Sequence, residues 1–288
     1  MRRIAALAAL LLAACDAAPP QPVTVYVPTE YEKQAREWLP ESGLDVTVVA
    51  ADSRQNVDRI IAKEDSPRAD VLISLGVHDI WRAGDQGALR PLQGAAFESI
   101  APALRDPAGP WAAMSIESVM IVHTANAPEA AVSSYADLGK PELAGQLCLT
   151  SSRLSSNRTL IGMLIEELGV KRAERVVRSW VRNLAQHPFS SEAELHEALE
   201  RGDCSYAIST VLAGEDGLTA YRPDPTYFDI RGIGIARHAQ HPDAARELVD
   251  WIFSEAPGLT PPPGSRNIGL AGWRDDEARL LSERAGYW

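Results

Sequence analysis

Apolar residues follow two spacings along this chain, and the two alternate from residue 23 onward. Short apolar runs are typical of strands, whereas apolar residues three or four positions apart are typical of amphipathic helices. The runs predict strands at residues 23–27, 44–50, 69–74, 115–123, 148–150, 204–212 and 233–236. The helical spacing predicts helices at residues 57–63, 79–87, 160–168, 171–184, 191–202, 242–254 and 275–284, and a capping box starts another at Thr29. This alternation predicts an α/β fold with ligands at the carboxyl ends of its strands.

The stretch 147–160 combines a short strand, a serine-rich loop and the start of a helix. Its polar residues around the helix start are Arg153, Ser155, Ser156, Asn157 and Arg158. Serine and asparagine are favoured N-caps, and a helix N-terminus exposes N–H groups that hold anions. The stretch therefore predicts either a capped helix alone or an anion site.

The N-terminal segment predicts export. Residues 1–14 resemble a secretory signal peptide, with an apolar run too short to span a membrane. The sequence Leu-Ala-Ala-Cys at residues 12–15 resembles the lipobox of bacterial lipoproteins, which implies that Cys15 carries lipid. Asp16 resembles a signal for retention at the inner membrane, and the proline-rich residues 15–22 resemble a tether. We expect a periplasmic, lipid-anchored protein of the inner membrane; the alternative is a cytoplasmic protein with an apolar start.

Composition narrows the function classes. The 288 residues are 45% hydrophobic and carry a net charge of −11. This charge argues against nucleic acid and anionic membranes as partners and weakly favours a cationic ligand. The histidines lack metal-site spacing, and no Gly-x-Ser-x-Gly motif is present, so we expect no enzyme rather than an exported hydrolase.

With Cys15 set aside for lipid, two cysteines remain. Cys148 and Cys204 lie in a chain bound for an oxidising compartment, so we expect a disulfide between them. The alternative is two buried free thiols.

Several motifs together resemble the type II periplasmic solute-binding proteins of ABC transporters, most of all their ferric-iron-binding branch. The segments that carry this resemblance are 23–31, 69–73, 106–111, 134–138, 143–149, 202–208 and 241–254. The resemblance implies a two-lobed α/β periplasmic-binding-protein type II fold with the ligand cleft between the lobes. Lobe 1 would comprise residues 22–114 and 232–288, and lobe 2 residues 115–231. It also implies a partner permease in the inner membrane, and a cysteine pair within lobe 2.

On the metal side, the resemblance is incomplete. Glu30 and Tyr31 stand where the family has ligands for Fe(III), which it binds with a synergistic anion, although an ordinary first helical turn would also explain them. Leu212 and Ala213 stand where the family has paired tyrosines. Other residues that could complete an iron site are Tyr206, Glu215 and Tyr221, for which ordinary strand and loop roles are the alternative.

On the anion side, the resemblance is retained. The implied ligand-binding residues are Ser151, Ser152, Arg153, Ser156, Asn157, Arg158 and Thr210. We therefore expect a binding protein for iron transport whose ligand is an iron chelate or a small anionic solute. The alternative is a sensor or interaction module on the same scaffold that no longer serves import.

Overall fold

The computed structural model describes residues 22–63, 68–128, 131–211, 217–255 and 258–288. The predicted signal peptide, Cys15 and nearly all of the tether lie outside these ranges, as do Leu212, Ala213 and Glu215. Within these ranges, no helix has both the length and the apolar character needed to cross a membrane.

The first sheet is organised around the buried strand β1. Its strands are β1 (Val23–Pro28), β2 (Val46–Ala51), β3 (Val71–Leu75), β4 (Leu89–Arg90), β5 (Ala112–Ser118) and β10 (Phe228–Ala236). β1 pairs in parallel with β2 and β3, while β10 runs antiparallel to β3, β4 and β5. β1 is buried along its whole length, as expected for a central strand covered on both faces.

The second sheet has four strands in the order β7-β8-β6-β9. They are β6 (Met120–Thr124), β7 (Leu147–Cys148), β8 (Tyr206–Ser209) and β9 (Leu218–Tyr221). A buried disulfide joins Cys148, the last residue of β7, to Cys204, just before β8, with 5.9 Å between their Cα atoms. This is the pairing expected from the sequence.

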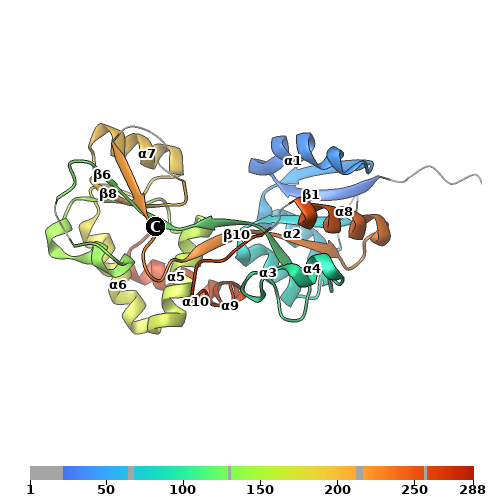
Figure 1. The fold of residues 1–288 in the computed structure, drawn as a ribbon. Coiled ribbons are helices and arrows are strands. Elements are labelled where there is room, and N and C mark those ends of the chain that lie inside the picture. The colour runs from blue at the N-terminus through green and yellow to red at the C-terminus, as the bar shows by residue number, and fades with distance from the viewer. Residues whose placement is uncertain (1–21, 64–67, 129–130, 212–216, 256–257) are drawn as a thin grey trace, which may run out of the picture.

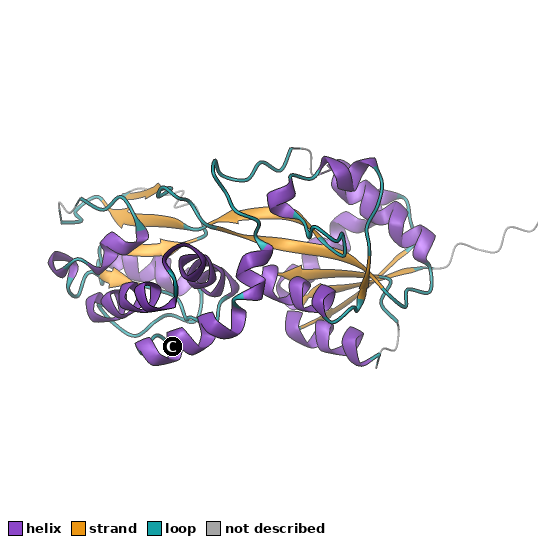
Figure 2. Ribbon diagram, turned by 90° about the horizontal axis from the view of Figure 1, so that it is seen from below, coloured by secondary structure: helices purple, strands orange, loops and turns teal. Residues whose placement is uncertain are grey.

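Ten α-helices are described around the two sheets. They are α1 (Glu32–Trp38), α2 (Ser53–Ala62), α3 (Val77–Asp85), α4 (Ala95–Ser99), α5 (Ser155–Leu168), α6 (Val170–Asn183), α7 (Glu192–Arg201), α8 (Pro242–Glu255), α9 (Gly269–Trp273) and α10 (Asp275–Ala285). Figure 1 shows two lobes, each built on one sheet and joined by long strands that include β10. The same bridge is visible from below in Figure 2.

The chain passes from the first sheet to the second at Val119. The sequence predicts one strand over residues 115–123, but the structure has β5 and β6 on either side of Val119. The Val119 N–H donates to the carbonyl of Tyr227, 2.9 Å away, which extends the β5–β10 pairing by one residue, and from Met120 onward the chain pairs with β8 and β9 instead. One continuous apolar run therefore forms β5 of the first sheet and β6 of the second.

The last two helices, α9 and α10, contact helices of both lobes that the sequence predicts. α10 packs against α5 and α6, and α9 packs against α5 and α3. The segment 269–285 thus contacts helices of the predicted lobe 2 as well as α3 of the predicted lobe 1. The division into residues 22–114 with 232–288 and residues 115–231 stays a prediction.

Candidate ligand-binding site between the two lobes

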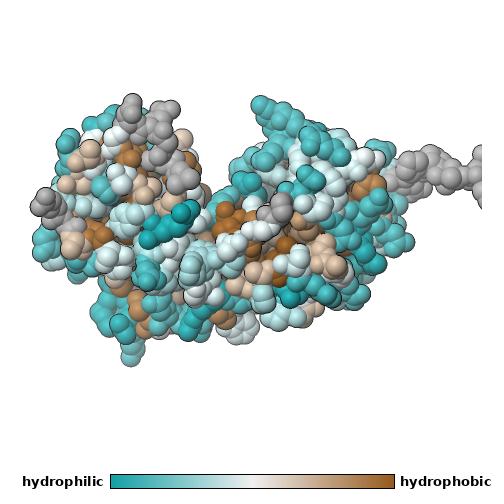
Figure 3. All heavy atoms as spheres, in the orientation of Figure 1, coloured by the Kyte–Doolittle hydropathy of each residue, from teal (hydrophilic) through white to brown (hydrophobic). Residues whose placement is uncertain are grey.

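A notch separates the two lobes on the face shown in Figure 3. The residues predicted to bind ligand lie on several elements: Glu30 and Tyr31 follow β1, Thr210 follows β8, and the others lie in the loop before α5 and in its first turn. Their availability for a ligand depends on the contacts that each side chain already makes.

Helix α5 begins differently from the sequence prediction. Its N-cap is Leu154, with an extended backbone and no side-chain cap, so Ser155, Ser156 and Asn157 are the first helical residues. The Asn157 amide Nδ2 instead turns back to Thr150, 2.7 Å from its Oγ1 and 3.2 Å from its carbonyl oxygen. Asn157 is 3% exposed, and its amide nitrogen holds the loop closed.

The penultimate residue of the chain fastens the same loop. The Tyr287 hydroxyl donates to the carbonyl of Thr150 at 2.7 Å, and the Ser152 hydroxyl donates to the carbonyl of Tyr287 at 3.0 Å. Burial raises the pKa of Tyr287, which keeps this phenol protonated as a donor. The Ser152 hydroxyl hydrogen is therefore committed to the protein.

Arg158 is already paired. Its Nε lies 2.8 Å from Asp275 Oδ1, and its Nη2 binds Asp275 Oδ2. Asp275 Oδ1 is also 3.3 Å from Nδ1 of the buried His78, whose Nε2 is 3.0 Å from the Thr159 hydroxyl. Burial, and then the Arg158 charge, lower the pKa of His78 to about 4. This network joins α3, α5 and α10.

Ser155 is a polar residue of this site that the implied ligand set does not include. Its Oγ is buried and has no hydrogen-bond partner among the described residues. It packs against Gly76, because a Cβ built on Gly76 would lie 1.6 Å from Ser155 Oγ. The Gly76 backbone has φ +87, and Asp229 Oδ1 accepts from the next N–H, that of Val77, at 3.1 Å. The start of α5 therefore abuts the start of α3.

Tyr31 lies close to β10, whose residue Arg231 contacts its ring. The Cζ atom of Arg231 is 5.0 Å from the Tyr31 ring centroid, and Arg231 Nη2 is 3.1 Å from Glu117 Oε1 on β5. Tyr31 is 4% exposed, and burial raises the pKa of its phenol, an effect that the Arg231 charge partly offsets. Burial also raises the pKa of Glu117. Glu30, by contrast, is exposed.

Thr210 is directed toward an acid on α7. The Thr210 N–H and hydroxyl both donate to Glu192 Oε1 at 3.3 Å, and the Ser209 hydroxyl donates to Glu192 Oε2 at 2.8 Å. These contacts connect the end of β8 to the start of α7. Glu192, like Arg231 and Glu117, is absent from the implied ligand set because no local motif marks it.

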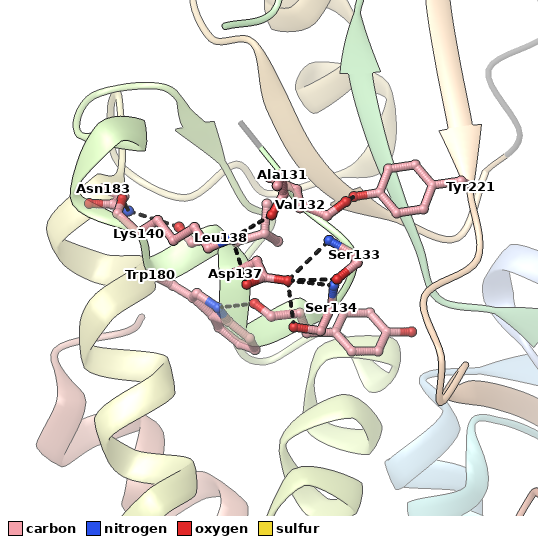
Figure 4. A network of polar contacts seen from close by, with 11 residues as sticks. Ala131, Val132, Ser133, Ser134, Asp137, Leu138, Lys140, Trp180, Asn183 and Tyr221 are labelled. Atoms are coloured by element: carbon pink, nitrogen blue, oxygen red, sulfur yellow. Dashed lines mark hydrogen bonds and ion pairs between the residues drawn. The ribbon is translucent and has the colours of Figure 1, made fainter. Parts of the chain in front are cut away.

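The two tyrosines considered for completing an iron site are occupied elsewhere. The Tyr206 hydroxyl donates to the carbonyl of Pro128 and the Tyr221 hydroxyl to that of Val132, each at 2.8 Å. Figure 4 shows Tyr221 beside a network around Asp137, which accepts from Ser133 and Ser134 and pairs with Lys140. In the described part of the chain, no three His, Cys, Asp or Glu side chains are grouped to hold a metal ion.

Comparisons with known proteins identify the family of this chain. The model of the family described as bacterial extracellular solute-binding protein matches residues 23–257. The chain is similar to iron uptake protein A1 of Synechocystis, with 23% identity over 248 residues that cover 79% of this chain and 68% of that protein.

This chain is also similar to solved structures, including the following two. The FutA (IdiA) protein of Trichodesmium in complex with iron and citrate has a TM-score of 0.78 and 22% identity, covering 93% of this chain and 100% of that one. Apo ferric ion-binding protein A of Pasteurella haemolytica has a TM-score of 0.80 and 20% identity, covering 92% and 98%. These similarities confirm the two-lobed α/β fold.

Proposed function

This chain belongs to the bacterial extracellular solute-binding proteins, and from that premise we propose that it captures a small anionic solute, free or as a ferric chelate, between its lobes. The family comprises binding proteins and not enzymes. The solute would pass to an ABC transporter permease in the inner membrane, with the chain held there by lipid at Cys15. Binding would favour a closed arrangement of the lobes because both lobes then contact the solute.

The contact of Tyr31 with Arg231 carries this proposal. Tyr31 follows β1 of the first lobe, whereas Arg231 and its partner Glu117 lie on the two strands that run toward the second lobe. The side chains of Arg231 and Glu117 are 28% and 34% exposed, so they are partly desolvated yet open to a ligand. A guanidinium with an aromatic ring on one side presents its remaining N–H donors to a carboxylate or phosphate.

The contacts favour a chelate over iron bound directly by the protein. Fe(III) held by phenolates needs several deprotonated tyrosines, yet burial raises the pKa of Tyr31, and Tyr206 and Tyr221 donate to backbone carbonyls. Iron carried inside an anionic chelate needs only donors to the chelate. The iron- and citrate-bound relative of the same fold makes ferric citrate a natural first probe.

The test is a thermal-shift titration combined with small-angle X-ray scattering of the purified chain. Citrate, phosphate, ferric citrate, and ferric chloride with carbonate are compared, since a bound ligand raises Tm by mass action. A rise in Tm and a smaller radius of gyration with citrate or ferric citrate support the proposal. A visible phenolate-to-iron absorption with ferric chloride and carbonate would instead indicate direct coordination. No change with any probe would reject solute capture and favour the sensor function.

A further inference from the structure

A largely apolar pocket of about 200 Å³ lies between three segments that are far apart in the sequence. The second half of α5 supplies one wall, the start of β10 and the residues before it supply another, and the segment before α9 supplies the third. α5 and β10 lie side by side in Figure 1. We call this cavity the α5–β10 pocket; its lining includes Met163, Glu167, Tyr227, Phe228, Arg266 and Ile268.

The α5–β10 pocket is separate from the candidate ligand-binding site. Phe228 lines the pocket, whereas the next residue of β10, Asp229, accepts from the Val77 N–H at the start of α3. Successive side chains of a strand point to opposite faces, so the pocket lies on the face of β10 opposite Asp229 and Arg231. None of the residues predicted to bind ligand lines it. A molecule in this pocket therefore occupies a second site.

The aromatic wall of the pocket is fixed where the chain passes between the two sheets. Tyr227 stacks on Tyr135, with 5.3 Å between the ring centroids and 10° between the ring planes. The Tyr135 hydroxyl donates to the Val119 carbonyl at 2.7 Å and accepts from the Tyr227 N–H at 3.1 Å. Phe228 and Ile268 are buried as well. Because these contacts hold the wall in place, a ligand can enter without first ordering the site.

Two charged residues line the pocket, and the positive one is already balanced. Arg266 Nη1 lies 3.6 Å from Glu166 Oε2 and donates to the Glu166 carbonyl at 3.1 Å. Glu166 also binds Arg274, which pairs with Glu277 in addition. These two arginines and two glutamates therefore form a neutral cluster at the edge of the pocket.

The negative lining residue, Glu167, has no cationic partner. In the described part of the chain its carboxylate forms no ion pair, and Oε2 accepts from the Tyr227 hydroxyl, so Oε1 is open to a ligand. Burial and the neighbouring Glu167 raise the pKa of Tyr227, which keeps its hydroxyl a donor. The hydroxyls of Thr226 and Ser265, also in the lining, donate to backbone carbonyls. These side chains therefore offer hydrogen-bond acceptors to a ligand.

The volume limits the occupant to one small ring or a short alkyl chain. A cavity of about 150 Å³ holds a benzene molecule, whereas drug-sized ligands occupy roughly 300–1,000 Å³. The α5–β10 pocket, at about 200 Å³, has room for one aromatic ring with a short chain. Its walls at Met163, Phe228 and Ile268 favour an apolar body. The open carboxylate of Glu167 favours a cationic donor at one end.

We propose that the α5–β10 pocket binds a small amphipathic amine, with its apolar body against Phe228 and Ile268 and its ammonium group on Glu167. The net charge of −11 attracts such a cation to the protein. This site goes beyond the proposed function, because it lies on the other face of β10 from the contact of Tyr31 with Arg231 and takes a ligand of opposite charge.

The test is a protein-observed NMR titration of the purified chain with phenethylamine, which follows weak binding and locates it. We expect saturable shifts centred on the amides of Tyr227, Phe228 and Ile268. Phenethyl alcohol, which is neutral, and phenylacetate, which is anionic, should bind about fivefold more weakly or worse, because neither forms an ion pair with the carboxylate. Methylammonium, which lacks an apolar body, should not saturate these shifts.

Substitutions test the role of the carboxylate. Glu167→Gln keeps the size of the side chain but removes its charge, so phenethylamine should bind about fivefold more weakly and lose its advantage over phenethyl alcohol. Tyr227→Phe keeps the ring and frees the carboxylate from its protein partner, so phenethylamine should bind more tightly. The matched control is Glu247→Gln, at an exposed position of α8 outside the lining, which should bind as the wild type does.

The contrary outcomes are distinct. Equal binding of phenethylamine and phenethyl alcohol would make this a neutral apolar site and overturn the amine assignment. Saturable shifts that centre elsewhere, or no saturable shifts, would overturn the site itself. If Glu167→Gln does not fold, weaker amine binding in Tyr227→Phe would still contradict the role of Glu167. None of these results bears on solute capture, which is measured with citrate and ferric citrate.

Discussion

The guanidinium of Arg231 lies over the ring of Tyr31, with its Cζ atom 5.0 Å from the ring centroid. This contact places a cation from the crossing strand β10 on an aromatic residue of the first lobe. Arg231 is also paired with Glu117, so its orientation is set from two sides. The contact between Arg231 and Tyr31 connects β10, which runs between the lobes, to the segment after β1, where the family resemblance implies iron-binding residues.

Tyr31→Phe is expected to weaken ligand binding while leaving the stability of the fold nearly unchanged. The Tyr31 hydroxyl has no hydrogen-bond partner among the described residues, and phenylalanine keeps the ring under Arg231. The free energy of unfolding should therefore change by less than about 0.5 kcal/mol, while the ligand-induced rise in Tm falls.

The control for that experiment is Tyr206→Phe. It removes a hydroxyl that donates to Pro128 and should cost about 1 kcal/mol of stability without changing ligand binding. An unchanged ligand response in Tyr31→Phe would remove the Tyr31 hydroxyl from the site.

Ser155→Ala is expected to leave the fold intact or to stabilise it slightly. It deletes a buried hydroxyl that lacks a protein partner, whose desolvation costs about 1–3 kcal/mol if nothing else satisfies it. Urea unfolding measures the stability, and calorimetry with citrate measures binding. Weaker binding at unchanged stability would indicate that this hydroxyl serves a ligand; a loss of more than about 1 kcal/mol would show instead a hidden structural role.

Gly76→Ala is expected to destabilise the junction of α3 and α5 by about 2 kcal/mol or more. A Cβ there would lie 2.6 Å from Ser155 Cβ, and φ +87 is unfavourable for alanine. Adding Ser155→Gly should recover part of the loss by removing that Cβ.

Gly43→Ala is the matched control, because Gly43 has φ +77 but a Cβ added there would meet nothing within 4 Å. It should cost only the backbone term, about 1 kcal/mol. Equal losses at Gly76 and Gly43 in urea unfolding would contradict a tight contact between α3 and α5.

Stability is expected to fall below neutral pH because of His78. Its folded pKa is about 4 and its ordinary value is 6.5, so between these values the unfolded chain binds a proton that the folded chain does not. Acidification from pH 7 to 4 should therefore remove up to about 3 kcal/mol. The raised pKa of the buried Asp79 acts in the opposite direction, so the informative quantity is the difference between variants.

Urea unfolding at several pH values measures this difference. His78→Gln should flatten the slope between pH 4 and 6.5, whereas His238→Gln, at an exposed position, should retain it. Parallel slopes for the wild type and His78→Gln would disprove a neutral, buried His78.

Reduction of the disulfide between Cys148 and Cys204 is expected to destabilise the protein by about 4 kcal/mol on the chain-entropy relation. The bond closes a loop with a sequence separation of 56 residues, and both cysteines are buried in one apolar cluster. Urea unfolding with and without reductant measures the effect, and the Cys148→Ala/Cys204→Ala variant should not respond to reductant. A change below about 1 kcal/mol on reduction would contradict a stabilising bond.

The sequence by itself determined the alternation of elements. The apolar runs of β1 and β3 and the amphipathic stripe of α6 are local patterns. A strand covered on both faces is apolar along its length, and a helix with one buried face is apolar every three to four residues. The pairing of Cys148 with Cys204 also followed, since few cysteines were available. Boundaries shifted where tertiary contacts intervened, as at Val119 and Leu154, and four short elements, β4, β9, α4 and α9, were not predicted.

The tertiary structure alone decided which polar residues are free. Arg153 and Arg158 look equivalent in the sequence, yet Arg158 is paired with Asp275, 117 residues away, while Arg153 faces a pocket. Arg231 meets Tyr31 only because β10 pairs with β3 and β5 in the first sheet and so lies near the end of β1. A side chain's chemistry is encoded locally, but its availability depends on which distant partner the packing brings within about 3 Å.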